Sequence, residues 1–482
     1  MKQRTTYLVS DTLATHPDNF DISPTSLQIK SLHAAREDRL AIGYDELSAE
    51  IQDVLKQCNE LLIRWSTGRP YTSVDPFAAR VPAGLHIHLR PQRDVVPSIC
   101  DTVNVAFGIT DCRGFAESFI PISGVENAYQ FYAPVRSIDM FATFVADHLC
   151  TGMNSWECAT GVESADYVDL KWDAISQMIV VNTFWSKSGE PQGAVAVNVQ
   201  EPRNIEVGVL GNDRPIAEES LTMGGVLHVV GKDDRMEPVM FTFPARHHSS
   251  PATYSLTTSK PPGLHPKLQL SIAHTQPLKA PGDECTLNAY FTLPRGLFID
   301  KYQLSPTNPQ LLESLNIKRI LGVNGETDLE APVWASKRWG SSLLVEVDTA
   351  RASNGLDMEL PLHLRYLEPK HDSTLSEVNF TMPAVFWACR SEEWSKMVSS
   401  PFDRLHLGWE HLFPEQTMYY HLSPSEDAWK SVPVPVLDLQ QAMLVKIGTV
   451  VVIVSGFLWV VWKTCAAFTG GKKVGAGEKK TQ

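Results

Sequence analysis

The stretch Cys285–Leu304, CTLNAYFTLPRGLFIDKYQL, decides the fold class of the C-terminal half of this chain. It predicts two strands, Thr286–Thr292 and Leu297–Tyr302, separated by a Pro-Arg-Gly turn. Short apolar runs follow the same rhythm from residue 237 to 423, and proline or glycine falls in nearly every gap. The other predicted strands are Met240–Phe243, Thr253–Leu256, Leu268–Ile272, Leu343–Val347, Leu360–Tyr366, Val378–Ala388 and Met418–His421. This pattern predicts a mainly β, β-sandwich-like domain over residues 236–435.

Residues 1–235 have a mixed pattern that predicts an α+β domain. Tyr44–Cys58 carries apolar residues at helical spacing with acidic residues early, and Met140–Cys150 predicts a second helix. The predicted strands are Leu61–Trp65, Leu85–Leu89 and a hairpin made by Tyr167–Trp172 and Met178–Trp185. Acidic, glycine-containing sequence from Gly211 to Gly225 predicts a connection, so we place the domain boundary near Lys232.

Composition excludes several classes of protein. The 482 residues carry a net charge of −13, which argues against a nucleic-acid binder that neutralises phosphates. A charged fraction of 20% argues against both a wholly disordered polymer and a protein with many membrane spans. Eight cysteines are too few for a disulfide scaffold, and no C-x-x-C pair suggests a zinc site.

One apolar segment near the C-terminus predicts a membrane anchor. Residues 442–462, AMLVKIGTVVVIVSGFLWVVW, have the composition of a transmembrane helix, with Trp459 and Trp462 as an interfacial pair. The following tail, residues 463–482, contains five lysines and one glutamate, a net charge of +4. The positive-inside rule places this short basic tail in the cytosol and the acidic body in a lumen.

The two ends of the chain bear on its compartment. The first twenty residues contain no apolar core or cleavage site of a signal peptide, so a lumenal body implies a single-pass type III arrangement. Lys479 and Lys480 occupy the spacing of a dilysine signal for retrieval to the endoplasmic reticulum (ER). A solvated basic tail would have the same composition, and both interpretations stay open.

Residue patterns that often perform chemistry are weak here. Asp328 and Glu330 imitate an acidic metal motif, but two carboxylates at this spacing are frequent by chance and the pattern favours a solvated loop. His86 and His88 lie on one face of a predicted strand without an identifiable third ligand, which favours ordinary strand histidines. His247-His248 is predicted to lie in a loop. No nucleophile–base motif supports an anchored hydrolase.

Three features concern covalent modification. Cys285 and Cys389 lie in predicted strands of one domain, where they form either a disulfide or two buried thiols. Asn379 begins the sequon Asn-Phe-Thr, a possible N-glycosylation site. Cys465 lies at the cytosolic edge of the predicted span, where palmitoylation would be possible.

Several motifs resemble those of the PIG-X / Pbn family. They are CTLNAYFTLPRGLFIDKYQL at Cys285–Leu304, GETDLEAPVW at Gly325–Trp334, WGSSLLVEV at Trp339–Val347, LPLHLRYLEP at Leu360–Pro369 and PAVFWAC at Pro383–Cys389. The stretch REDRLAIGYDELSAEIQDVLKQCNELLIRW is similar to the longer, fungal Pbn members. The resemblance therefore extends over most of the chain.

The resemblance implies a function that is not catalytic. It implies an accessory subunit of the ER mannosyltransferase that adds the first mannose to the glycosylphosphatidylinositol (GPI) precursor. Its partner would be the multi-span catalytic subunit of the PIG-M type, with no cofactor and no catalytic residues. In fungi, the family also aids the folding or stability of other lumenal proteins. A general lumenal chaperone or degradation adaptor would have the same layout and is the alternative.

Overall fold

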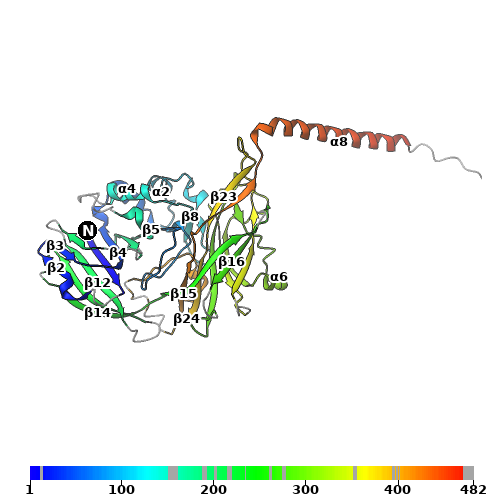
Figure 1. The fold of residues 1–482 in the computed structure, drawn as a ribbon. Helices are drawn as coiled ribbons and strands as arrows, with labels where there is room; N and C mark the ends of the chain where they lie inside the picture. Colours follow the sequence, from blue (N-terminus) through cyan, green and yellow to red (C-terminus); the bar gives the residue numbers. More distant parts are fainter. Residues whose placement is uncertain are drawn as a thin grey trace, which may run out of the picture.

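A computed structural model describes the chain outside residues 11–14, 150–160, 187–192, 200–203, 214–219, 234, 260–262, 274–277, 351–354, 393–396, 398–399, 401 and 471–482. Two large sheets lie side by side in the body, and one long helix extends away from it (Figure 1). The two sheets contact each other through buried side chains of both halves of the chain.

The first sheet has eleven strands and contains the N-terminal half of the chain. From edge to edge they are β14 (Glu237–Pro244), β13 (Ser220–Val230), β12 (Ile205–Asp213), β1 (Lys2–Val9), β4 (Ala34–Gly43), β10 (Met178–Trp185), β9 (Tyr167–Asp173), β5 (Cys58–Ser66), β6 (Gly84–Pro91), β8 (Tyr129–Ala133) and β7 (Ile120–Pro121). Only β1 and β12 pair in parallel within this sheet, as far as the described strands show.

Helices cover one face of this sheet. They are α1 (Ala49–Leu55), α2 (Ile99–Phe107) and α4 (Asp139–His148), and the short α3 (Phe115–Ser118) precedes β7. The rings of Phe107 and Phe141 stack with centroids 4.8 Å apart and join α2 to α4 in the core. A small sheet of β11 (Val195–Asn198), β3 (Ser26–Ile29) and β2 (Phe20–Ser23) packs against β1 and β12 through Leu27 and Val207.

The sequence predicted parts of this domain correctly. The hairpin of β9 and β10 and the helix near Met140 are confirmed. The helix predicted from Tyr44 is shorter, because a 3-10 turn precedes α1 and Cys58 already begins β5. The connection predicted at Gly211–Gly225 is too long, because β12 continues to Asp213 and β13 begins at Ser220.

The second sheet has eight strands and forms most of the C-terminal domain. They are β19 (Ile317–Gly325), β20 (Gly340–Val347), β17 (Cys285–Pro294), β24 (Ala384–Arg390), β25 (Thr417–Pro424), β15 (His247–Thr258), β16 (Lys267–Ala273) and β21 (Leu356–Pro361). The chain passes from the first sheet to the second between Pro244 and His247. This change lies beyond the boundary of 235/236 that the sequence suggested, because β14 still belongs to the first sheet.

Two-stranded sheets cover the end of the second sheet. One pairs β23 (Leu375–Thr381) with β26 (Trp429–Pro435), and the other pairs β18 (Leu297–Phe298) with β22 (His363–Leu364). Phe380 of β23 is fully buried in the same core as Phe291 of β17. The single strand predicted at Val378–Ala388 is therefore two strands, separated at Pro383, which has no N–H to donate to a ladder.

One helix lies outside the body. The short α6 (Pro309–Ser314) precedes β19. The last described element is α8 (Ala442–Gly470), which extends away from the body (Figure 1). The segment Leu439–Thr469 is long and apolar enough to cross a membrane, and none of its most apolar stretch is buried. The expected fold class is confirmed: a mainly β body with mixed α+β structure at its start, and one apolar C-terminal helix.

Candidate functional site between the two sheets

A buried ion pair joins the two domains. On the face of the first sheet opposite the helices, Arg64 of β5 lies directly across from Asp169 of β9. Arg404, from the segment between β24 and β25, binds the same carboxylate with two parallel hydrogen bonds, Nε to Oδ2 at 2.6 Å and Nη2 to Oδ1 at 2.8 Å. Arg64 Nε lies 3.3 Å from Oδ1. The two guanidinium groups therefore share one carboxylate.

Electrostatics keep this carboxylate ionised. Burial alone would raise the pKa of Asp169, but Arg404 and Arg64 together hold the pKa below its ordinary value. Burial would lower the pKa of Arg404, but the electrostatic interactions with Asp169 and Tyr167 hold this pKa above its ordinary value. The guanidinium carbon of Arg404 lies 3.9 Å from the centre of the Tyr167 ring, and Nη1 donates to the Ala79 carbonyl at 2.6 Å. Arg404 thus contacts two separate segments of the N-terminal domain, β9 and the segment that carries Ala79.

A groove of about 560 Å³ opens beside this ion pair. Strands β5, β6 and β8 form one wall, and residues 405–415 with β25 form the other. His406 Nε2 lies 3.1 Å from Glu60 Oε1 across the groove. Burial raises the pKa of Glu410 against the opposing effect of Arg64. Within the described part of the chain, Glu410 Oε1 and the Nε and Nη1 of Arg64 are buried without a hydrogen-bond partner.

Several histidines lie near the same interface, and His86, His247, His248 and His421 make hydrogen bonds there. His86 and His88 share one face of β6, as the sequence suggested, and burial lowers both pKa values, that of His86 to about 4. The loop predicted for His247-His248 is wrong, because both residues begin β15 and are buried. His247 Nδ1 lies 2.9 Å from His421 Nε2, and its other ring nitrogen lies 3.0 Å from the Arg404 carbonyl. These contacts explain the histidines as interface residues.

The remaining acidic candidate supports a turn. Asp328 lies in the exposed connection between β19 and β20, where its carboxylate accepts hydrogen bonds from the backbone N–H groups of Glu330 and Ala331. These two hydrogen bonds lower the pKa of Asp328. Among the described residues, no cluster of three His, Cys, Asp or Glu side chains has the spacing of a metal site.

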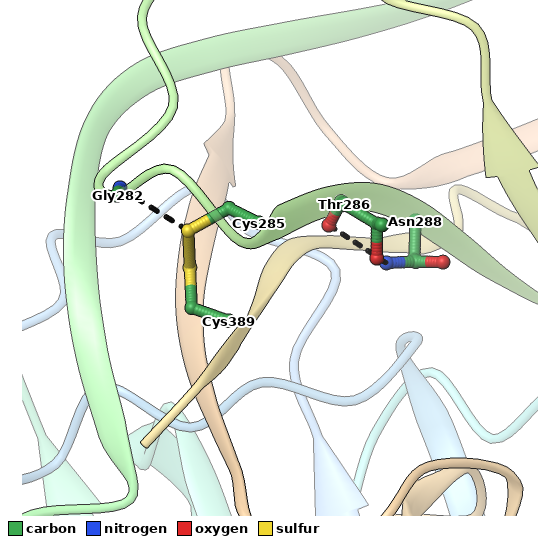
Figure 2. The surroundings of a disulfide bond; sticks show 5 residues. All are labelled: Gly282, Cys285, Thr286, Asn288 and Cys389. Carbon is green, nitrogen blue, oxygen red and sulfur yellow. Dashed lines mark hydrogen bonds between the residues drawn. A yellow bond between two sulfur atoms is a disulfide. The ribbon is translucent and has the colours of Figure 1, made fainter. Parts of the chain in front are cut away.

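Two disulfides are present in the described part of the chain. Cys285 and Cys389 are directly opposite each other on β17 and β24, and their sulfurs are bonded (Figure 2). The sequence missed the second disulfide, Cys100–Cys112, which ties α2 to the loop that follows it. The only hint was the short spacing of these two cysteines. Cys465 has an exposed free thiol in α8.

The sequon lies on an exposed strand beside the junction of the two domains. The Asn379 side chain of β23 is exposed, and its Oδ1 lies 3.5 Å from Arg136 of the N-terminal domain. Thr381 is buried, with its hydroxyl 3.1 Å from the Tyr132 hydroxyl. Lys479 and Lys480 lie outside the described residues.

Comparison with known proteins identifies the family. The family described as PIG-X / PBN1 matches residues 261–465. A protein of Emericella nidulans named Protein pbn1 is 38% identical over 96% of this chain and 95% of its own length. The chain belongs to the PIG-X / PBN1 family. Similar proteins named Protein pbn1 are 36% identical in Aspergillus oryzae, covering 98% of both chains, and 34% identical in Neurospora crassa, covering 92% of both.

The range of the family match contains one side of the buried ion pair and not the other. Residues 261–465 include Arg404, the Cys285–Cys389 disulfide and most of α8. Asp169 and Arg64 lie outside that range, in the N-terminal part of the chain, which the Emericella nidulans relative also covers. The PIG-X / PBN1 domain of this chain is thus held to its N-terminal sheet by a residue from within the family match.

Proposed function

We propose that this chain is a non-catalytic accessory subunit of GPI mannosyltransferase I in the ER membrane. It binds the multi-span catalytic subunit that adds the first mannose to the GPI precursor and stabilises it. Membership of the PIG-X / PBN1 family supports this role. The type III orientation, with the body in the lumen and residues 463–482 in the cytosol, is part of the same proposal.

The observation that carries the proposal is the uncovered helix α8, the one helix among the described residues that is long and apolar enough to cross a membrane. The mannose donor and the acceptor are both lipid-linked, so an enzyme that joins them needs several spans to enclose them within the bilayer. One helix does not enclose such a pocket, and the described body covers none of α8. Small residues at Gly448, Ser455 and Gly456 leave open surface on α8, where another helix packs closely.

Binding to a folded partner stabilises that partner by mass action. Depletion of this chain should therefore lower the steady-state amount of the catalytic subunit and cause the unmannosylated glucosaminyl lipid to accumulate. An unrelated multi-span ER protein, measured in the same cells, should keep its normal amount. A broad loss of lumenal and membrane proteins instead would favour the general chaperone.

A paired substitution tests the non-catalytic role. Asp328→Asn with Glu330→Gln alters exposed carboxylates, one of which orders a turn, and should reduce mannosyl transfer only as far as it reduces the amount of complex. The amount of complex is measured by affinity isolation in mild detergent, and transfer is measured in the same membranes. A normal amount of complex without any transfer would refute the accessory role and make this acidic pair a catalytic candidate.

A further inference from the structure

Large apolar side chains are exposed at the end of the body from which α8 departs. They are Leu329, Trp334, Tyr366, Leu375 and Leu437, which we call the apolar rim. Trp334 is 56% exposed and Tyr366 61% exposed. Large apolar side chains that are exposed together at one end of a protein mark a surface that binds a partner or a membrane.

Strand register places the Trp334 loop at that end of the second sheet. Gly325, which ends β19, pairs with Ser341 of β20, and the same end of β20 pairs with Pro294 of β17. The connection between β19 and β20, which carries Leu329 and Trp334, therefore emerges where β17 ends. The chain after β22 arrives at the same place, because Arg365 N donates to the Gly296 carbonyl at 3.0 Å.

Backbone hydrogen bonds continue from this loop to the start of α8. Val333 N donates to the Tyr366 carbonyl at 3.0 Å. Lys370 N donates to the Leu437 carbonyl at 3.1 Å, and Leu439 N donates back to Lys370 at 2.8 Å. Figure 1 shows the end of β23 close to the point where the chain turns into α8.

The rim is held rigidly although its side chains are exposed. Arg365 is buried, and its Nη1 donates to the carbonyls of Asp328 at 2.5 Å and Ala331 at 2.7 Å. Its guanidinium carbon lies 4.1 Å from the centre of the Phe298 ring. The buried Arg365 side chain therefore holds the loop that carries Trp334 against the body.

A bilayer that contains α8 lies near the end of the body that carries Leu437. Leu437 precedes Ala442 by five residues, which span at most about 17 Å of extended chain. Tryptophan and tyrosine favour the interfacial layer of a membrane, where an apolar ring and a polar edge are both accommodated. Exposed Lys337 and Arg338 follow Trp334 and suit the phosphate groups of the lipids.

We propose that the apolar rim lies in the interfacial layer of the bilayer and holds the body against the membrane surface. The inference rests on the membrane-spanning α8 of the proposed function. It adds a second, independent contact with lipid, which limits the angles at which the body meets a partner in the membrane.

Quenching of tryptophan emission by brominated lipid tests this contact. The full chain alone is reconstituted into vesicles of phosphatidylcholine, with or without bromine near the carbonyl end of one acyl chain. The emission of Trp334 is the difference between wild type and Trp334→Phe, and it should lose most of its intensity in brominated vesicles. Trp185→Phe is the matched control, because Trp185 lies on the first sheet and its emission should be unaffected.

Further outcomes separate the possible failures. Quenching of Trp459 and Trp462, measured with Trp459→Phe and Trp462→Phe, reports whether α8 is inserted at all. If these two are quenched while the Trp334 emission is unchanged, the rim contact with lipid is refuted and the spanning helix stands. A shift of Trp334 emission only when the co-expressed catalytic subunit is present would also refute it, and would assign the rim to a protein partner.

Discussion

Replacing Arg404 by leucine removes the charge that the C-terminal domain inserts into the N-terminal sheet. The substitution deletes both hydrogen bonds to Asp169 and leaves the Ala79 carbonyl without its donor. A hydrogen bond to a charged group contributes about 1.5–3 kcal/mol, and an unsatisfied buried acceptor costs about 1–3 kcal/mol. Arg64 still neutralises Asp169 after the change, which limits the loss. We expect a loss of about 3–5 kcal/mol in the free energy of unfolding.

This loss is measured by urea unfolding of the full chain in detergent, followed by tryptophan fluorescence. Arg390→Leu is the matched control, because Arg390 pairs with Glu284 at 3.4 Å on the exposed surface and such a pair contributes little. If Arg404→Leu and Arg390→Leu unfold at the same urea concentration as wild type, the buried ion pair does not hold the domains together. A changed midpoint in Arg390→Leu alone would equally contradict the reasoning.

The same pair gives a pH dependence. The folded pKa of Asp169 is lowered, so its contribution to stability is present above the unfolded pKa of about 3.9 and is lost as pH falls through the folded pKa. Asp169→Asn leaves two buried arginines without a partner carboxylate and should be less stable than wild type at neutral pH. We expect the difference in stability to be constant above about pH 5 and to shrink as the pH falls below about 4. A difference that grows on acidification would refute the assignment.

Other predictions concern the disulfide, the glycosylation site and retention in the ER. Replacing Cys285 and Cys389 together by serine should lower the free energy of unfolding by about 4–5 kcal/mol, because the disulfide closes a long loop in the unfolded chain. Non-reducing peptide mapping of wild type should recover the cross-linked pair. Two free thiols would contradict this prediction. Asn379→Gln should remove any glycan, seen as loss of the shift in electrophoretic mobility on glycosidase treatment; no shift in wild type would show that Asn379 carries none. Lys479→Ser with Lys480→Ser should let the protein reach the Golgi in fractionation, and an unchanged distribution would place retention in α8 or the complex.

Alternation of apolar residues made the local strand pairs predictable. In β9 and β10 the apolar residues recur at every second position or run continuously, and the two strands are adjacent in sequence, so the hairpin follows from local signals. The glycines at residues 211–225 made the predicted connection too long, because glycine is common in turns. In β13, a side chain at Gly225 would lie 2.0 Å from the Val209 carbonyl, so glycine serves close strand packing there and not a turn.

The interface was not predictable, because its partners are far apart in sequence. Arg64 stands in the apolar run LLIRW and Asp169 in YVDLKW, where alternation assigns both to a solvent-facing side of the sheet. The structure covers that side with the second domain, and Arg404 arrives from more than two hundred residues away. The one local signal was that Arg64 and Asp169 have opposite charges and lie opposite each other on neighbouring strands. This signal is visible only when the strand register is known.

The polar character of this interface has a consequence for the two halves of the chain. An isolated C-terminal domain would expose side chains that now contact the N-terminal domain, among them Arg404 and Tyr419. Arg404 would lose its carboxylate, and the isolated first sheet would expose the carboxylate of Asp169 beside Arg64. Each half therefore supplies a charge that the other half buries, and we infer that the two halves of the body fold as one unit.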